Sequence, residues 1–174
     1  MSMKKKTATS DWLDGDEEGA WRAFRRMTVG VRTRIGQALA ATGLSEADYE
    51  VLSTLVERPD TTSPLHLQAA KMGWSRSRLS RHASRMEERG LIERAPDPED
   101  GRGCLLVLTR AGRDALRAAT PRHLESVRHH FADLLDADDL RDIKRIAEKL
   151  CAGGSAASQP EIDRQPGHDQ PGAP

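Results

Sequence analysis

Apolar residues recur at steps of three and four along much of this chain, which is the period of an amphipathic α-helix. The first such stretch predicts one long helix over residues 17–42, ended by Gly43. Its apolar positions are Ala20, Phe24, Met27, Val31, Ile35 and Leu39. A helix with a single apolar stripe of this length has to bury the stripe against a partner.

Cap signals place the next two helices. Ser45 and Asp48 have the spacing of a capping box, in which each side chain accepts a hydrogen bond from the other residue's backbone N–H. A second helix is therefore expected to begin there. Proline is preorganised for the first helical position, so we expect Ser63-Pro64 to begin a short third helix that ends at Gly73.

Another helix is predicted directly after that glycine. Ser75 is its expected N-cap, residues 76–89 form the helix, and Gly90 ends it. Its apolar face consists of Leu79, Ala83 and Met86. Two helices only a few residues apart, with a glycine between them, have the pattern of a helix-turn-helix.

A β-hairpin wing is predicted next. Residues 91–95 and 104–108 are strand candidates, and the loop between them is rich in Pro, Asp and Gly.

Two further helices are expected after the wing. Thr109 caps one over residues 110–135, in which Pro121 is expected to force a kink or a break. Asp136 caps the last helix, which is expected to end before Gly153.

The expected fold is mainly α with a small two- to three-stranded β wing, a winged helix-turn-helix with long N- and C-terminal dimerisation helices. The predicted parts are a partly flexible arm (1–16), a helical dimerisation region (17–42 and 110–150), a DNA-binding domain (45–109) and a disordered tail (151–174). The tail has too few apolar residues to repay the entropy of ordering. A homodimer is expected because three apolar stripes exceed what one small domain can cover.

Composition limits the choice of function. Lys+Arg and Asp+Glu are both 27, so nucleic-acid binding has to come from a local patch rather than from the net charge. There are two cysteines, too few for a disulfide framework, and no apolar run is long enough for a membrane span. We therefore expect a cytoplasmic protein.

One local patch is strongly basic. From Lys71 to Arg85 the chain carries five basic residues and no acidic one. Short hydroxyl side chains between arginines allow a helix to approach a groove closely, and arginine pairs with guanine edges. The expected DNA contacts on this helix are Ser75, Arg76, Ser77, Arg78, Ser80 and Arg81. The alternative is a solvated surface helix that happens to be rich in arginine.

The wing loop contributes one further candidate. Arg102 stands between two glycines at the expected hairpin tip, where an arginine can enter a minor groove. The nearby acids Asp97, Glu99 and Asp100 suggest that a carboxylate holds this arginine in place. The alternative is an ordinary turn arginine.

The run from Gly73 to Gly112, GWSRSRLSRHASRMEERGLIERAPDPEDGRGCLLVLTRAG, resembles the core of the MarR family of bacterial transcription regulators. The resemblance covers about residues 17–150. It implies a dimer built from the terminal helices, recognition-helix contacts near Ser75 to Arg81, a wing contact from Arg102, and control by a small ligand or oxidant. A repressor is the predicted sense of control.

A ligand site is predicted in the crevice between the dimerisation helices and the wing domain. Trp21 and Arg25 share one face of the first helix and offer an aromatic wall and a guanidinium for an aromatic or anionic effector. His66 is expected to complete the site. In the competing interpretation, Trp21 is a core residue and Arg25 a surface charge.

Other function classes find little support. The spacing of the histidines does not fit a metal site, so we expect no bound metal. No nucleotide-binding, metalloprotease or nucleophile-elbow motif occurs, so we expect no cofactor and no enzyme activity. Two alternatives stay open: a winged helix that binds only proteins, and a redox-sensing regulator using Cys104 or Cys151.

Overall fold

The computed structural model describes residues 12–98, 100–101 and 103–155. Its helices are α1 (Gly15–Ala40), α2 (Glu46–Val56), α3 (Leu65–Lys71), α4 (Arg76–Glu88), α5 (Arg110–His130) and α6 (Ala137–Ser155), with a 3₁₀ turn at Ala132–Leu134. The strands are β1 (Thr62–Pro64), β2 (Ile92–Pro96) and β3 (Cys104–Leu108). The chain divides after Leu134 into two compact units, the second of which contains α6.

The expected caps form. The Ser45 side chain accepts from the backbone N–H of Asp48, and the Asp48 side chain accepts from that of Ser45, so the predicted capping box is confirmed. Ser75 caps α4 and Thr109 caps α5 in the same way, each accepting from the residue three positions on. Local sequence therefore sets where these helices begin.

The sheet has three antiparallel strands in the order β1-β3-β2. The predicted short helix forms as α3, but it begins one residue later than expected, because Pro64 is its N-cap and Ser63 pairs with Leu106 of β3. Proline is tolerated here because β1 is an edge strand, where a missing N–H costs no ladder hydrogen bond. The expected fold class, mainly α with a small sheet, is confirmed.

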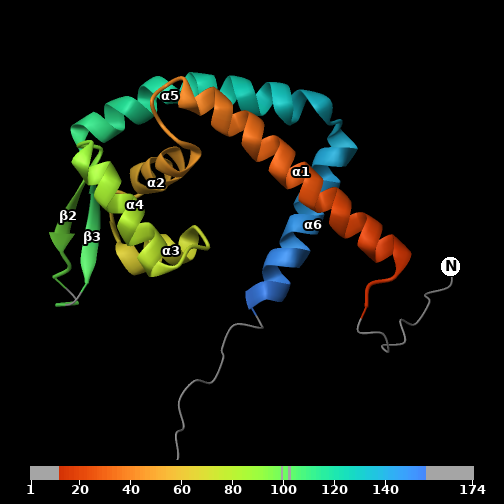
Figure 1. Ribbon diagram of the computed structural model, residues 1–174, viewed down its shortest axis with the longest axis horizontal. Helices are drawn as coiled ribbons and strands as arrows, with labels where there is room; N and C mark the ends of the chain where they lie inside the picture. Colours follow the sequence, from red (N-terminus) through yellow and green to blue (C-terminus); the bar gives the residue numbers. More distant parts are fainter. Residues whose placement is uncertain (1–11, 99, 102, 156–174) are drawn as a thin grey trace, which may run out of the picture. The chain divides into compact units, whose positions relative to one another are not determined.

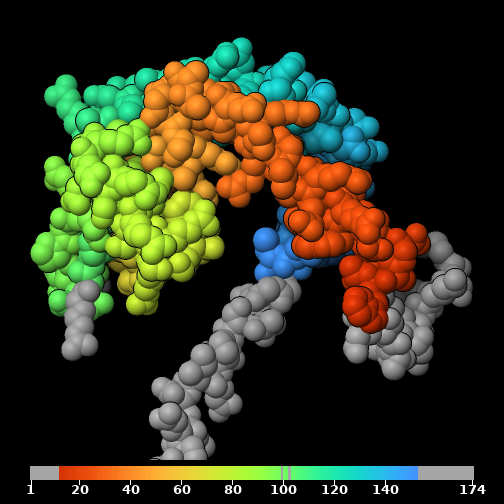
Figure 2. Space-filling view, viewed as in Figure 1, coloured from red at the N-terminus to blue at the C-terminus, as the bar shows by residue number. Residues whose placement is uncertain are grey.

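The core of the first unit is formed by side chains of helices α1 to α5 and of the sheet. Figure 2 shows the surfaces of α3, α4 and the wing strands packed against one another. The largest fully buried apolar side chains are Leu39, Leu52, Leu55, Leu79, Met86, Ile92 and Leu106. Gly112 lets α5 approach this core, because a Cβ there would lie 2.0 Å from the carbonyl oxygen of Leu91.

Helix α5 lies beside α1 (Figure 1) and continues through Pro121 to His130. The expected break is therefore absent, and the helix ends before the predicted residue 135. Pro121 and Arg117 are both exposed, so water can solvate the Arg117 carbonyl that loses its helical donor.

Helix α6 begins after Asp136, whose carboxylate accepts from the backbone N–H groups of Asp138 and Asp139, as expected of its cap. The prediction that this helix ends before Gly153 is wrong, because it reaches Ser155 and includes the first five residues of the predicted disordered tail. A glycine costs a helix only about 1 kcal/mol relative to alanine and does not by itself end it. No helix among residues 12–155 that the structure describes is long and apolar enough to span a membrane.

Candidate nucleic-acid interface

Helix α4 has one buried and one exposed face, as its sequence predicts. Leu79, Ala83 and Met86 have no exposed surface and pack into the core. On the opposite side the exposed residues in the first two turns are Arg76, Ser77, Arg78 and Arg81. None of these three arginines makes an ion pair with an acidic residue in the described part of the chain. Their charges therefore face solvent and are available to phosphates or bases.

Ser80, by contrast, contacts the wing. The guanidinium of Arg94 on β2 donates from Nη2 to Ser80 Oγ and from Nη1 to Ser84 Oγ, each at 3.1 Å. The backbone N–H of Arg94 also donates to Glu87 at 3.1 Å. Arg94 thus fastens the first wing strand to the recognition helix. This role of Arg94 is not predictable from the sequence, because nothing in a single strand pattern indicates which helix an arginine will meet.

A second group of contacts surrounds Trp74, the residue before the N-cap of α4. The Arg78 guanidinium carbon lies 3.9 Å from the centre of the Trp74 ring, within the range of a cation–π contact. The ring of His82 also meets the Trp74 ring, edge to face with centroids 5.5 Å apart. The tryptophan is partly buried against the core.

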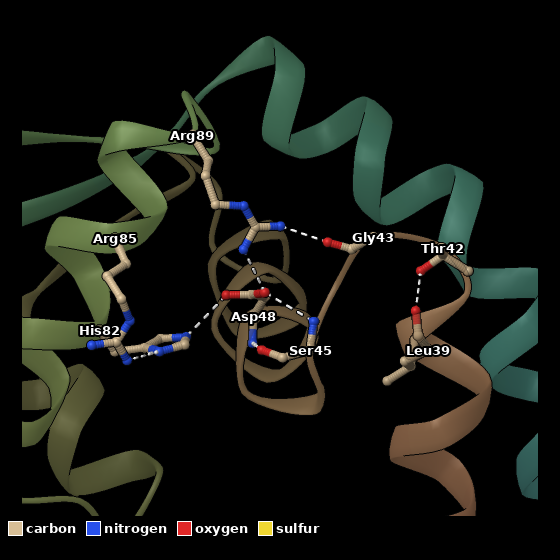
Figure 3. Close-up of polar contacts among 8 residues, drawn as sticks. All are labelled: Leu39, Thr42, Gly43, Ser45, Asp48, His82, Arg85 and Arg89. Carbon is tan, nitrogen blue, oxygen red and sulfur yellow. Dashed lines mark hydrogen bonds and ion pairs between the residues drawn. The ribbon is translucent and has the colours of Figure 1, made fainter.

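His82 is buried and connects α4 to α2 (Figure 3). Its Nε2 lies 3.1 Å from Oδ1 of Asp48, and its Nδ1 lies 3.1 Å from Nη2 of Arg85. Arginine can only donate, so Nδ1 accepts from Arg85, and Nε2 faces the carboxylate of Asp48 at ion-pair distance.

Asp48 is the centre of this cluster and is 3% exposed. Besides His82, its carboxylate accepts from Arg89 Nη1 at 2.8 Å and from the backbone N–H of Ser45 at 2.9 Å. Burial by itself would raise the pKa of Asp48, but the hydrogen bonds from His82, Arg89 and Ser45 outweigh it and hold that pKa well below its ordinary value. Arg89 Nη2 also donates to the Gly43 carbonyl at 2.6 Å, so the cluster ties the end of α4 to the loop between α1 and α2.

The wing loop is tight on both sides of its tip. The Asp97 N–H donates to the Gly103 carbonyl at 3.3 Å, and the Gly103 N–H donates to that of Asp100 at 2.6 Å. A Cβ at Gly103 would lie 2.8 Å from the Asp97 Cβ, so glycine is needed there. Arg102 lies outside the described residues, and its predicted minor-groove contact stays a prediction.

The residues proposed to bind an effector do not converge within one chain. His66 lines a hollow of about 350 Å³ between the start of α3, the first turns of α4 and the wing, together with Arg76 and Arg94. Arg25 lines a different hollow, of about 460 Å³, that runs along α1. Trp21 is 51% exposed and stacks on Phe24 with centroids 6.0 Å apart, so it is not a core residue of the chain.

A histidine on α5 has a separate environment. The ring of His123 stacks on Tyr49 of α2 with centroids 4.2 Å apart, and burial lowers the pKa of this histidine, while Glu46 nearby acts weakly in the opposite direction. The described residues contain no group of histidine, cysteine, aspartate or glutamate side chains arranged to hold a metal.

A recognition helix with an unpaired basic face, a helix before it, and the β2–β3 hairpin after it in a three-stranded sheet define a winged helix-turn-helix DNA-binding protein. Comparison with known proteins agrees. The MarR family model matches residues 42–103. The chain is 31% identical to AbsC, a MarR family transcriptional regulator of Streptomyces coelicolor, with a TM-score of 0.78 over 84% of this chain and 99% of AbsC. It belongs to the MarR family and is a transcriptional regulator, not an enzyme.

Two further solved structures are similar. Sco3205, a MarR family regulator of Streptomyces coelicolor solved in complex with DNA, is 27% identical, with a TM-score of 0.78 over 87% of this chain and 97% of Sco3205. CouR of Rhodococcus jostii, solved with p-coumaroyl-CoA bound, is 26% identical, with a TM-score of 0.67 over 81% of this chain and 95% of CouR.

Proposed function

We propose that this regulator is a cytoplasmic repressor that binds a pseudo-palindromic operator as a homodimer and is released by a small aromatic or anionic ligand. The observation that carries the DNA-binding part is the exposed face of α4, where Arg76, Arg78 and Arg81 have no acidic partner in the described chain. The DNA complex of the similar protein Sco3205 supports the same use of this fold.

Direct contacts are proposed for Ser75, Arg76, Ser77, Arg78 and Arg81 on α4 and for Arg102 in the wing. Ser80 is retained in the interface, but its hydroxyl already accepts from Arg94, so its direct contribution is expected to be small. A two-fold dimer would place its two recognition helices in successive major grooves about 34 Å apart, which is why the operator should be an imperfect palindrome.

The homodimer is supported by apolar side chains that one chain leaves open. On α1 these are Trp21, Phe24 and Met27, each at least 41% exposed, and on α6 they are Leu140, Ile146 and Leu150. Apolar surface on this scale is rarely left in water by a monomer. Light scattering at micromolar concentration is expected to give the mass of a dimer, and a pure monomer would refute this part.

The effector proposal rests on Trp21 and Arg25, on the α1 surface, and on His66. His66 lines a different hollow from Arg25. A ligand that touches all three residues would therefore need side chains from both subunits, or a movement of α1 relative to the wing domain. CouR supports ligand control in this fold, because its solved complex contains p-coumaroyl-CoA. Screening aromatic acids for operator release, and repeating with Arg25→Ala, tests the site; unchanged potency on the variant would remove Arg25.

Binding to duplex DNA at about 50 and 200 mM salt tests the main proposal. Several arginine–phosphate contacts predict a loss of affinity of about a thousandfold or more over this range. The alternative, a winged helix that binds only proteins, predicts no measurable binding at either salt concentration. A reporter gene placed behind an operator that the protein binds then tests repression. Deletion of the regulator is expected to raise expression of the reporter.

A further inference from the structure

We propose that Arg78 is the specificity-determining residue of the recognition helix, that it reads one guanine in each half of the operator, and that Trp74 is its positioning residue. The inference rests on DNA binding by α4 as proposed above. It goes further, because it singles out one arginine among several and states what it recognises.

The arginines near α4 differ in what their guanidinium groups already contact. Arg85 donates to His82, Arg89 donates to Asp48 and to the Gly43 carbonyl, and Arg94 donates to two serines. These three guanidinium groups are engaged in contacts that hold the domain together. Three others, Arg76, Arg78 and Arg81, are exposed and have no ion pair in the described chain.

Arg78 is the one of these three that the described residues hold in place. Its guanidinium carbon is 3.9 Å from the centre of the Trp74 ring. Stacking uses the flat face of the guanidinium and leaves the N–H groups in its plane available as donors. An arginine that is restrained before it binds loses less side-chain entropy on contact, so its directional hydrogen bonds count for more.

Trp74 is itself fixed by the buried cluster. His82 meets its ring edge to face, and His82 is held between Asp48 and Arg85. The position of the Arg78 guanidinium is therefore set, through two rings, by a carboxylate in the N-terminal turn of α2. The exposed Arg76 and Arg81 have no corresponding support among the described residues and are suited to phosphates, which tolerate many side-chain poses.

The position of Arg78 in the helix also fits base recognition. It is the third residue of α4, and the N-terminal residues of a recognition helix are the ones that contact base edges. A planar guanidinium donates two parallel hydrogen bonds to O6 and N7 of guanine, a pattern that the other bases do not offer in the major groove. Replacing that guanine is expected to weaken binding by about 5- to 150-fold.

The test uses the full-length chain and a random duplex library. Wild-type protein and the variants Arg78→Ala, Arg78→Lys, Trp74→Ala, Trp74→Phe and Trp74→Leu are each used to select binding sites, and Arg81→Ala is the matched control with the same loss of charge. Affinities are then measured on the selected operator and on copies with one base pair changed. Thermal unfolding of each variant checks that it is folded.

We expect wild-type sites to share a G·C pair at one position of each half-site. Both Arg78 variants are expected to lose that preference, because lysine keeps the charge but not the planar pair of donors. Trp74→Ala is expected to reduce the preference at the same position only, and Trp74→Phe to restore part of it. Arg81→Ala is expected to weaken binding to all sequences equally and to leave the preference intact.

Several outcomes would overturn the inference. An unchanged base preference in Arg78→Ala excludes Arg78 as the reader. An unchanged preference in a folded Trp74→Ala excludes the positioning role of Trp74. If that variant does not fold, an unchanged preference in Trp74→Leu, which keeps an apolar side chain but no aromatic ring, excludes it. Wild-type protein that binds no duplex in a salt-dependent way refutes the proposed function itself, which is a different failure.

Discussion

Replacing Asp48 by alanine is expected to destabilise the protein far more than an ordinary surface change. Asp48 is 3% exposed and accepts from His82, Arg89 and the Ser45 N–H. Removing it takes away the carboxylate that faces the buried His82 ring and breaks the capping box of α2. Truncating one partner of a buried ion pair costs about 3–5 kcal/mol. Arg89 is 44% exposed and can return to water, so about 3 kcal/mol is the better expectation.

The measurement is urea unfolding of wild type and Asp48→Ala at one fixed protein concentration, because the stability of the proposed dimer would depend on concentration. Asp114→Ala is a matched control: its carboxylate is 54% exposed and reaches two arginines only at 3.4 and 3.9 Å, so its loss is expected to change little. If Asp48→Ala costs no more than this control, the cluster does not stabilise the fold.

The same cluster predicts an acid dependence. The pKa of Asp48 is lower in the folded chain than in the unfolded one, so the folded state binds fewer protons there. Its contribution is fully present above the ordinary pKa of 3.8 and declines as the pH falls below that value. Asp48→Asn is expected to flatten this part of the stability curve. An equally steep acid loss in that variant would assign it to other carboxylates.

Three further predictions follow from single positions. Gly112→Ala is expected to prevent stable folding, because the added Cβ would lie 2.0 Å from the backbone oxygen of Leu91. Gly101→Ala is the control, since an added Cβ there would meet nothing within 4 Å. Similar melting temperatures for the two variants would contradict the prediction. Burial lowers the pKa of His123, so its contribution to stability is present above about pH 6.5 and is lost as the pH falls below that value. His123→Phe is expected to reduce the slope of stability against pH between about 7 and 5. An unchanged slope would show that His123 does not cause this pH dependence. Arg102→Ala is expected to weaken operator binding by about 1–3 kcal/mol in a titration, and wild-type affinity would remove the wing from recognition.

The sequence predicts those parts of the structure that depend on neighbours in the chain. Capping by Ser45, Ser75 and Thr109 is local, because each hydroxyl accepts from a backbone N–H three residues away. The buried and exposed faces of α4 follow from helical periodicity in the same way. The strand β1 was missed because three residues have no period, and only pairing with β3, more than forty residues further on, makes them a strand.

The missed parts of the candidate interface are long-range contacts. Asp48 is correctly placed in a cap by its spacing from Ser45, but no pattern indicates that it also meets His82, in a different helix. Arg94 likewise acquires its role only when the wing packs against α4. The contact of Trp74 with Arg78 is the exception, because the two residues are only four positions apart and their spacing could have indicated it. The sequence shows that this helix is basic, but it does not show which of its arginines already donate hydrogen bonds within the protein.

The hydrogen bonds from Arg94 to α4 distinguish positions of the recognition helix that can be substituted without loss of stability from positions that cannot. Ser80 and Ser84 accept from that guanidinium, so changing them would loosen the wing as well as the helix. Arg76, Ser77 and Arg81 have exposed side chains, and the two arginines are unpaired within the described chain. An engineer who wishes to redirect this regulator to a new operator can therefore randomise the exposed positions of the helix, beginning with Arg78, and leave Ser80, Ser84 and the wing unchanged. Natural divergence of binding sites can follow the same route without passing through unstable intermediates.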